Sequence, residues 1–333
     1  MKRRSFLVLS LSAAACQPVP GAVPQASLPD VTLFDPSAAR FFVDGAALEV
    51  LGEGYGWSEG PTWDRSRGAL YFTDVPGNTA YQWTRTGGVK VFLAPSGGTV
   101  TEGFREPGAN GLWYARDGSL LISNHGARAL ERMDIDTKAR RTLAATYGGK
   151  RFSSPNDVVE ASDGTLYFSD PPYGLEGLDD SPLKEMEANG VYRLSPSGAV
   201  ERLLADMTRP NGVALSPDES TLYIAQSDPE APILRALDLA TGATRTLFDF
   251  KPYQDAGLPG LPDGIAVAGT GELFVTGPGG VYLLTAEGDA LARVDTGVAT
   301  ANCAFGEDGS TLFITAHTKL LRLPTRLKGL QWS

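Results

Sequence analysis

The chain of 333 residues has little histidine and little cysteine, with two residues of each. Its histidines, His125 and His317, cannot supply a three-histidine zinc site. Positive charge is also in short supply, because 29 lysines and arginines stand against 39 aspartates and glutamates and leave a formal net charge of -10. Nucleic acid and anionic membrane surfaces attract basic proteins, so we expect neither of them as a partner.

The apolar stretch from Phe6 to Ala15 is too short to cross a bilayer core of about 30 Å as a helix. It follows a basic segment, Lys2 to Arg4, and this order is typical of an export signal. The segment from Arg3 to Leu7 resembles a twin-arginine signal, which exports proteins after they have folded. We therefore expect residues 1–16 to be an export signal and the mature protein to be periplasmic.

The end of this signal resembles a lipoprotein processing site, with the sequence Ala-Ala-Ala-Cys at positions 13–16. We expect a lipid anchor at Cys16, with simple cleavage nearby as the alternative. Residues 17–38 are rich in proline and are predicted to form an extended tether. The second cysteine, Cys303, lies in an apolar run and is predicted to be a small buried hydrophobe.

Six similar segments recur along the rest of the chain, and each joins a polar turn residue to an apolar strand. They read SEGPTW, GANGLW, SPNDVV, RPNGVA, LPDGIA and TANCAF. The polar residues are Glu59, Asn110, Asn156, Asn211, Asp263 and Asn302. A second apolar strand follows each opening, as in LYFTD and LYFSD.

The openings are separated by 51, 46, 55, 52 and 39 residues, a period typical of propellers and solenoids. We predict an all-β fold, a single six-bladed β-propeller over residues 39–327, in which an N-terminal strand completes the last blade. The longest insertion, residues 173–189, is predicted to be a lid, and its SPLKEME segment is expected to form one or two helical turns.

On a closed ring the six polar residues would point at one axis. Carboxylate and amide oxygens without thiolates or a histidine cluster suit a hard cation such as Ca²⁺. Alternatively, each polar residue only caps its own strand, as Asn and Asp often do. Two carboxylates close to one axis would need a cation or protonation, which favours the metal site. Asp74 and Asp170, which end second strands, are expected to bridge blades or to brace the site.

From Glu59 almost to its end, the chain resembles the gluconolactonase and regucalcin (senescence marker protein) family of six-bladed propellers. The resemblance rests on EGPTW, SPNDVV, LYFSDPPYG, RPNGVALSPDE, LPDGIAV, VTGPGGVY and ANCAFGEDGSTLFITA, whose order is most similar to the bacterial sugar-lactonase branch. It implies one divalent cation held by Glu59, Asn211 and Asp263. Asn156 would lie beside the cation and contact substrate, or be a fourth ligand as in related phosphotriesterases.

Two positions depart from this resemblance. Ser154 stands where regucalcin has an arginine, so regucalcin's substrate contacts cannot all be transferred. Asn124, before His125, stands where the bacterial branch often has a glutamate.

The predicted function is metal-dependent hydrolysis of sugar-acid lactones. A cation, most simply Ca²⁺ with Zn²⁺, Mn²⁺ or Mg²⁺ as alternatives, would polarise the carbonyl and activate a water molecule. Asp263 is the predicted general base, and Asn156, Asn110 and His125 are predicted to orient the sugar hydroxyls. Two alternatives stay open: a promiscuous metal-dependent esterase or phosphotriesterase, and a non-catalytic propeller that binds a ligand or protein. The sequence leaves the oligomeric state open.

Overall fold

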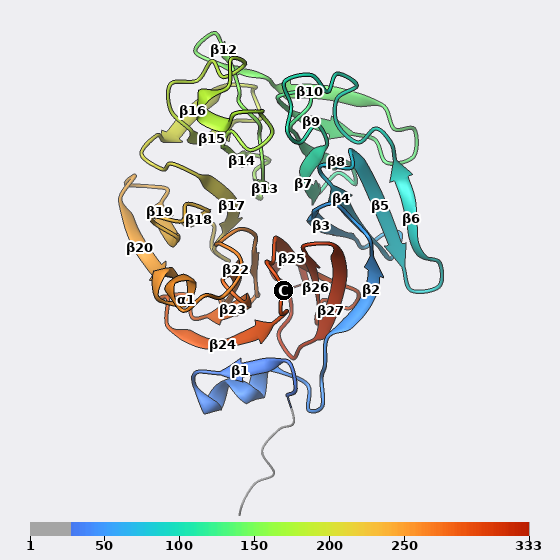
Figure 1. Ribbon diagram of the computed structural model, residues 1–333, viewed down its shortest axis with the longest axis vertical. Coiled ribbons are helices and arrows are strands. Elements are labelled where there is room, and N and C mark those ends of the chain that lie inside the picture. The colour runs from blue at the N-terminus through green and yellow to red at the C-terminus, as the bar shows by residue number, and fades with distance from the viewer. Residues whose placement is uncertain (1–27, 333) are drawn as a thin grey trace, which may run out of the picture.

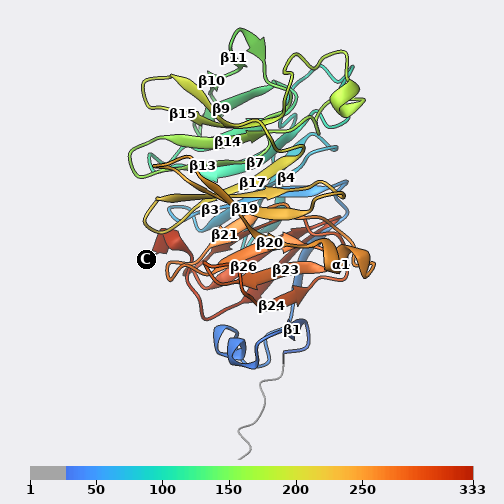
Figure 2. The ribbon, with the colours of Figure 1, turned by 90° about the vertical axis from the view of Figure 1, so that its left-hand side faces the viewer.

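The computed structural model describes residues 28–332, and these form a ring of antiparallel sheets around a central axis (Figure 1). The predicted export signal, Cys16 and the first part of the predicted tether lie outside the described residues. In the side view the strands of successive blades lie stacked across the molecule (Figure 2). No helix in residues 28–332 has the length and apolar character needed to cross a membrane.

Each of the first four blades uses four strands that are consecutive in the sequence. Blade one contains β3 (Ser58–Asp64), β4 (Ala69–Asp74), β5 (Thr79–Thr84) and β6 (Gly88–Leu93). Blade two contains β7 (Ala109–Tyr114), β8 (Leu120–Asn124), β9 (Ala129–Met133) and β10 (Arg140–Ala144). Blade three contains β13 (Val158–Glu160), β14 (Leu166–Asp170), β15 (Gly190–Leu194) and β16 (Val200–Leu204). Blade four contains β17 (Pro210–Leu215), β18 (Thr221–Gln226), β19 (Ile233–Asp238) and β20 (Thr244–Asp249).

The last two blades also include strands from the N-terminal side of the chain. Blade five contains β21 (Ile265–Val267), β22 (Leu273–Gly277), β23 (Gly280–Leu284) and β24 (Ala290–Asp295), with β1 (Val31–Leu33) at its edge. Blade six contains β25 (Asn302–Gly306), β26 (Thr311–Ala316), β27 (Lys319–Pro324) and β2 (Glu49–Glu53). The short elements between blades are the hairpin β11 (Thr146–Tyr147) and β12 (Lys150–Arg151), and α1 (Lys251–Asp255).

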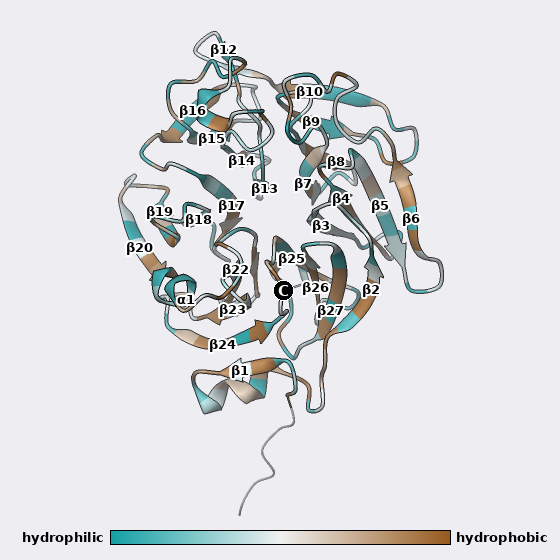
Figure 3. Ribbon diagram, in the orientation of Figure 1, coloured by the Kyte–Doolittle hydropathy of each residue, from teal (hydrophilic) through white to brown (hydrophobic). Residues whose placement is uncertain are grey.

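The ring closes as predicted, because β2 pairs antiparallel with β27 and completes blade six. Arg322 on β27 donates from Nε to Glu49 Oε2 across this pairing at 2.8 Å. The inner strands β3, β7, β13, β17, β21 and β25 contact one another in this order, and β25 returns to β3. Outer strands such as β16 and β20 contain both hydrophilic and hydrophobic residues (Figure 3). Their residues range from exposed to partly or fully buried.

The folded domain begins earlier than predicted, so the assignment of residues 31–38 to a tether is wrong. Strand β1 pairs with β24, and the 3-10 helix η1 (Pro36–Phe41) follows it. The Asp35 side chain accepts a hydrogen bond from Ser37 N at 2.8 Å and caps η1. A strand of three residues is too short to show a clear alternation of polar and apolar residues in the sequence. In the structure, Val31 and Leu33 pack against a buried cluster of blades five and six.

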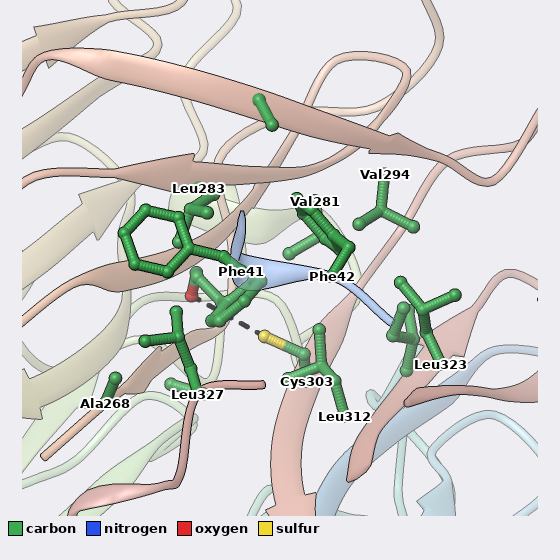
Figure 4. Close-up of a cluster of buried hydrophobic side chains, with 14 of the residues drawn as sticks. Phe41, Phe42, Ala268, Val281, Leu283, Val294, Cys303, Leu312, Leu323 and Leu327 are labelled. Atoms are coloured by element: carbon green, nitrogen blue, oxygen red, sulfur yellow. Dashed lines mark hydrogen bonds between the residues drawn. The ribbon is translucent and has the colours of Figure 1, made fainter. Parts of the chain in front are cut away.

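Figure 4 shows this cluster, in which Phe41 and Phe42 lie among side chains of blades five and six. Cys303 is buried here, as predicted, and its Sγ lies 3.6 Å from the Phe274 carbonyl oxygen, to which it donates. Burial raises the pKa of the Cys303 thiol far above its ordinary value. Cys303 is therefore a core residue with no nucleophilic character.

The predicted helical turns at residues 181–187 are wrong. A 3-10 helix, η2 (Leu178–Asp180), precedes this segment, and Lys184 N then donates to Ser181 O at 3.0 Å in a tight turn. Pro182 stands at the second position of that turn, which proline favours. Met186 is buried with side chains of blades two and three, and residues 182–189 contain turns and bends.

Candidate metal and substrate site

The six predicted polar residues lie at equivalent places, at or just before the start of the inner strands. Glu59, Asn110, Asn211 and Asn302 are strand residues of β3, β7, β17 and β25. Asn156 and Asp263 each stand two residues before their strand, β13 and β21 respectively. The repeat therefore places all six residues at or just before the starts of neighbouring inner strands around the axis.

Glycines let the inner strands approach closely beside these residues. Gly60 lies so near blade two that a Cβ atom there would be 2.2 Å from Asn110 O. A Cβ atom at Gly212 would be 2.0 Å from Asp263 O. No side chain fits at such distances, so glycine after Glu59 and Asn211 is a packing requirement of the axis.

Glu59 is buried and held by two hydrogen bonds. Trp57 Nε1 donates to Oε1 at 3.2 Å, and Gly60 N donates to Oε2 at 3.1 Å. Burial, followed by the nearby negative charge of Asp157, raises the pKa of Glu59 to about 7. The site therefore disfavours a free carboxylate at this position unless a cation is present.

Asp263 and Asn211 present oxygen atoms without hydrogen-bond partners. Oδ1 of each residue is buried and has no partner among the described residues. Asn211 Nδ2 donates to Ser227 Oγ at 2.9 Å, which turns the amide oxygen away from Ser227. Burial and the charges of Glu59, Asp157 and Glu106 raise the pKa of Asp263 well above its ordinary value.

This donor set fits a hard divalent cation. Unpartnered buried acceptor oxygens are costly, and a cation satisfies them while neutralising the two carboxylates. Within residues 28–332 no group of three or more His, Cys, Asp or Glu side chains is arranged to hold a metal ion. A cation at this place would therefore depend on the amide oxygens of Asn211 and Asn156 as well as on Glu59 and Asp263.

Asn156 and Asn110 are both buried beside this set. Gly111 N donates to Asn156 O at 2.7 Å, and Thr73 Oγ1 donates to Asn110 O at 3.0 Å. The backbone of each asparagine is thus fixed by an element of the preceding blade, which leaves the amide side chain as the group that can meet a ligand.

Asp74 and Asp170 brace the loops that lead to the site, as expected. Asp170 accepts from Ser153 N at 2.9 Å and from Ser154 N at 2.8 Å, just before Asn156. Asp74 accepts from Trp57 N at 3.1 Å, just before Glu59. One carboxylate therefore orients the approach to each of these two site residues.

The structure places His125 beneath the insertion and away from solvent. A Cβ atom at Gly174 would lie 2.8 Å from His125 Cβ, and His125 is fully buried. Neither ring nitrogen has a hydrogen-bond partner among residues 28–332. Burial lowers the pKa of His125 to about 3, so its ring is neutral. Its contact with substrate stays a prediction.

Two carboxylates near the site were missed by the sequence analysis. Asp157 is buried, and it accepts from Val158 N at 2.9 Å and from Val213 N at 3.0 Å. Glu106 is buried in the connection between β6 and β7, and its charge contributes to the raised pKa of Asp263. Asp157 adjoins the predicted Asn156, but Glu106 lies outside every repeat, so no periodic signal marks it.

The insertion reaches across this end of the ring. Tyr173 OH donates to Ser227 O at 3.0 Å, and Ser227 Oγ donates to Pro262 O, next to Asp263. A cavity of about 350 Å³ is lined by residues of all six inner strands and by Trp332 near the end of the chain. Of the six polar residues, Asn302 is the one that lines it.

The chain is similar to known proteins along most of its length. Residues 57–318 match the SMP-30/Gluconolactonase/LRE-like region family. A gluconolactonase of Zymomonas mobilis is 41% identical over 309 residues, covering 90% of this chain and 87% of the relative. The structure of a gluconolactonase from Xanthomonas campestris is 31% identical, with a TM-score of 0.77 over 93% of this chain and 99% of that one.

A more distant structure, the calcium-binding protein regucalcin from Agrobacterium tumefaciens, has the same fold. It is 22% identical, with a TM-score of 0.67 over 85% of this chain and 95% of that one. The matched residues include all six inner strands and all six polar residues at the axis. The chain belongs to the SMP-30/gluconolactonase/LRE-like family of six-bladed β-propellers.

Proposed function

We propose that this protein is a lactonase that opens sugar-acid lactones with the help of one divalent cation. The observation that carries the proposal is the pair of buried, unpartnered Oδ1 atoms of Asn211 and Asp263 beside the buried carboxylate of Glu59. The relatives named gluconolactonase support the lactone substrate and the enzyme class.

Glu59, Asn211 and Asp263 would hold the cation, with Asn156 as a fourth ligand or a substrate contact. Oxygen donors alone favour Ca²⁺ over softer ions. When bound, the cation would polarise the lactone carbonyl and stabilise the negative charge that develops on its oxygen.

Asp263 would act as the general base. Its carboxylate takes a proton from the attacking water while the water oxygen bonds to the carbonyl carbon. The ring C–O bond then breaks, and the proton returns to the departing ring oxygen, so one lactone and one water give one hydroxy acid. Asn156 and Asn110 would orient the sugar hydroxyls, with His125 as a further candidate contact.

The test is hydrolysis of a panel of aldonolactones by protein treated with a chelator and by the same protein after Ca²⁺ is restored. We expect hydrolysis only with the cation present. Full activity in chelator would refute the mechanism. Hydrolysis of phosphotriesters or simple esters in preference to aldonolactones would favour the promiscuous alternative, and no hydrolysis of any kind would favour a binding module.

We also propose that the protein is exported and anchored by lipid at Cys16. The support is the sequence of residues 1–16 alone. A single acyl chain binds a membrane weakly, but lipoprotein processing supplies more than one. We expect Cys16→Ser to release the protein from the membrane fraction or to block processing. Active cytoplasmic protein with an intact Met1 terminus, detected by mass spectrometry, would contradict the proposal.

A further inference from the structure

Glu106 is a buried carboxylate that the proposed chemistry does not use. It lies in the long connection between β6 and β7, and 9% of the residue is exposed. The negative charges of Glu59, Asp157 and Glu106 all raise the pKa of Asp263. Of these three residues, Glu59 belongs to the predicted cation ligands. Asp157 has both of its oxygens occupied by backbone N–H groups of Val158 and Val213. Glu106 is the carboxylate left without an assigned role.

The two oxygens of Glu106 differ in their surroundings. Oε1 lies 3.0 Å from Arg105 Nη2, and Arg105 is itself half exposed. Oε2 faces His125 Nδ1 at 3.8 Å, too far for a hydrogen bond. His125 is neutral, and its ring lies near both the backbone and the side chain of Glu106 without a hydrogen bond of normal geometry. Glu106 Oε2 therefore keeps capacity to accept a hydrogen bond from a ligand.

The insertion holds Glu106 at this end of the ring. The N–H groups of Arg105 and Glu106 both donate to Gly174 O, at 3.0 and 3.3 Å. Glu176 N donates to Gly103 O at 3.0 Å, which joins the same two segments a second time. The adjoining Tyr173 is tied to Ser227, the partner of Asn211. The insertion thus links the Glu106 backbone to Ser227 and Asn211 through hydrogen bonds at Gly174 and at the adjoining Tyr173.

We propose that Glu106 binds hydroxyl groups of the sugar lactone, on the part of the ring away from the carbonyl, and so selects polyhydroxylated substrates. This inference rests on the proposed lactonase function. A carboxylate accepts hydrogen bonds from hydroxyl groups, and a lactone ring without hydroxyl groups has no such donor. A site built to bond a hydroxyl rejects an analogue that lacks it, because the buried polar group is then left unpaired.

The test compares glucono-1,5-lactone with δ-valerolactone, which has the same ring without hydroxyls. The variant is Glu106→Gln, and the matched control is Glu102→Gln, an exposed residue of the same connection. We expect Glu106→Gln to lower kcat/KM for glucono-1,5-lactone relative to kcat/KM for δ-valerolactone. The ratio should fall roughly tenfold or more, which is the size expected for the loss of a charged hydrogen bond. The control should keep the wild-type ratio.

An unchanged ratio in Glu106→Gln, or an equal loss on both lactones, would overturn the inference while leaving the lactonase function in place. Thermal unfolding checks that the variant folds. If it does not, Glu106→Asp, which keeps the charge but shortens its reach, is measured for the same ratio with the same two outcomes. If the wild type hydrolyses neither lactone, the proposed function itself fails, and this inference fails with it.

Discussion

Asp157 Oδ2 accepts a hydrogen bond from Val213 N at 3.0 Å and thereby joins blade three to blade four beside the axis. Its other oxygen accepts from Val158 N at 2.9 Å, so the side chain also fixes its own strand. Asn156 and Asn211 stand next to the two joined segments. One carboxylate thus sets the spacing between two of the predicted ligand residues.

Asp157→Ala should destabilise the protein, because two buried N–H groups lose their acceptors. Each unsatisfied buried group costs about 1–3 kcal/mol, so the variant should lose roughly 2–6 kcal/mol of unfolding free energy. Urea unfolding measures this loss. Glu287→Ala, which removes an exposed carboxylate, is the control and should change stability little. A stable Asp157→Ala protein would contradict the bracing role.

Ser227 orients Asn211, because its Oγ accepts from Asn211 Nδ2 and donates to Pro262 O. Ser227→Ala frees the amide to rotate, so we expect cation affinity to fall about tenfold or more, as for other residues that orient metal ligands. Isothermal titration with Ca²⁺ measures the change. Ser220→Ala, at an exposed turn of the same blade, is the control. Equal affinities for wild type and Ser227→Ala would contradict the role of Ser227 in orienting Asn211 toward the cation.

Cation binding should depend on pH near neutrality. Burial raises the pKa of Glu59 to about 7 in the cation-free protein, so below that pH a proton occupies the carboxylate that the cation needs. The affinity for Ca²⁺ should therefore fall as the pH drops from 8 to 6, with proton release on binding. Titrations in buffers of different ionisation enthalpy count these protons. Affinity independent of pH over this range would contradict the assignment of Glu59.

The parts of the fold that repeat could be predicted from sequence, and the parts that occur once could not. Glu59, Asn211 and Asp263 could be grouped from the sequence because each stands at or just before the start of an equivalent strand, and a closed ring brings such positions together. Family, propeller fold and closure by β2 are confirmed. The roles of the individual site residues remain predictions.

The errors and omissions have a common physical origin. Strand β1 is only three residues long and is stabilised by β24, which is distant in sequence. Glu106 acquires its place from hydrogen bonds to Gly174 in another blade, which no local pattern encodes. Tertiary contacts determine both features, and local propensity has little influence on either.

The central claim, that Glu59 and Asp263 hold a cation needed for lactone hydrolysis, is tested most directly by one paired measurement. Glucono-1,5-lactone hydrolysis and Ca²⁺ titration are measured on Glu59→Gln, Asp263→Asn and the exposed-residue control Glu287→Gln. We predict that the first two variants lose both cation binding and hydrolysis above the uncatalysed rate, while the control keeps both. Hydrolysis at the wild-type rate by folded Glu59→Gln or Asp263→Asn protein without bound cation would contradict the claim.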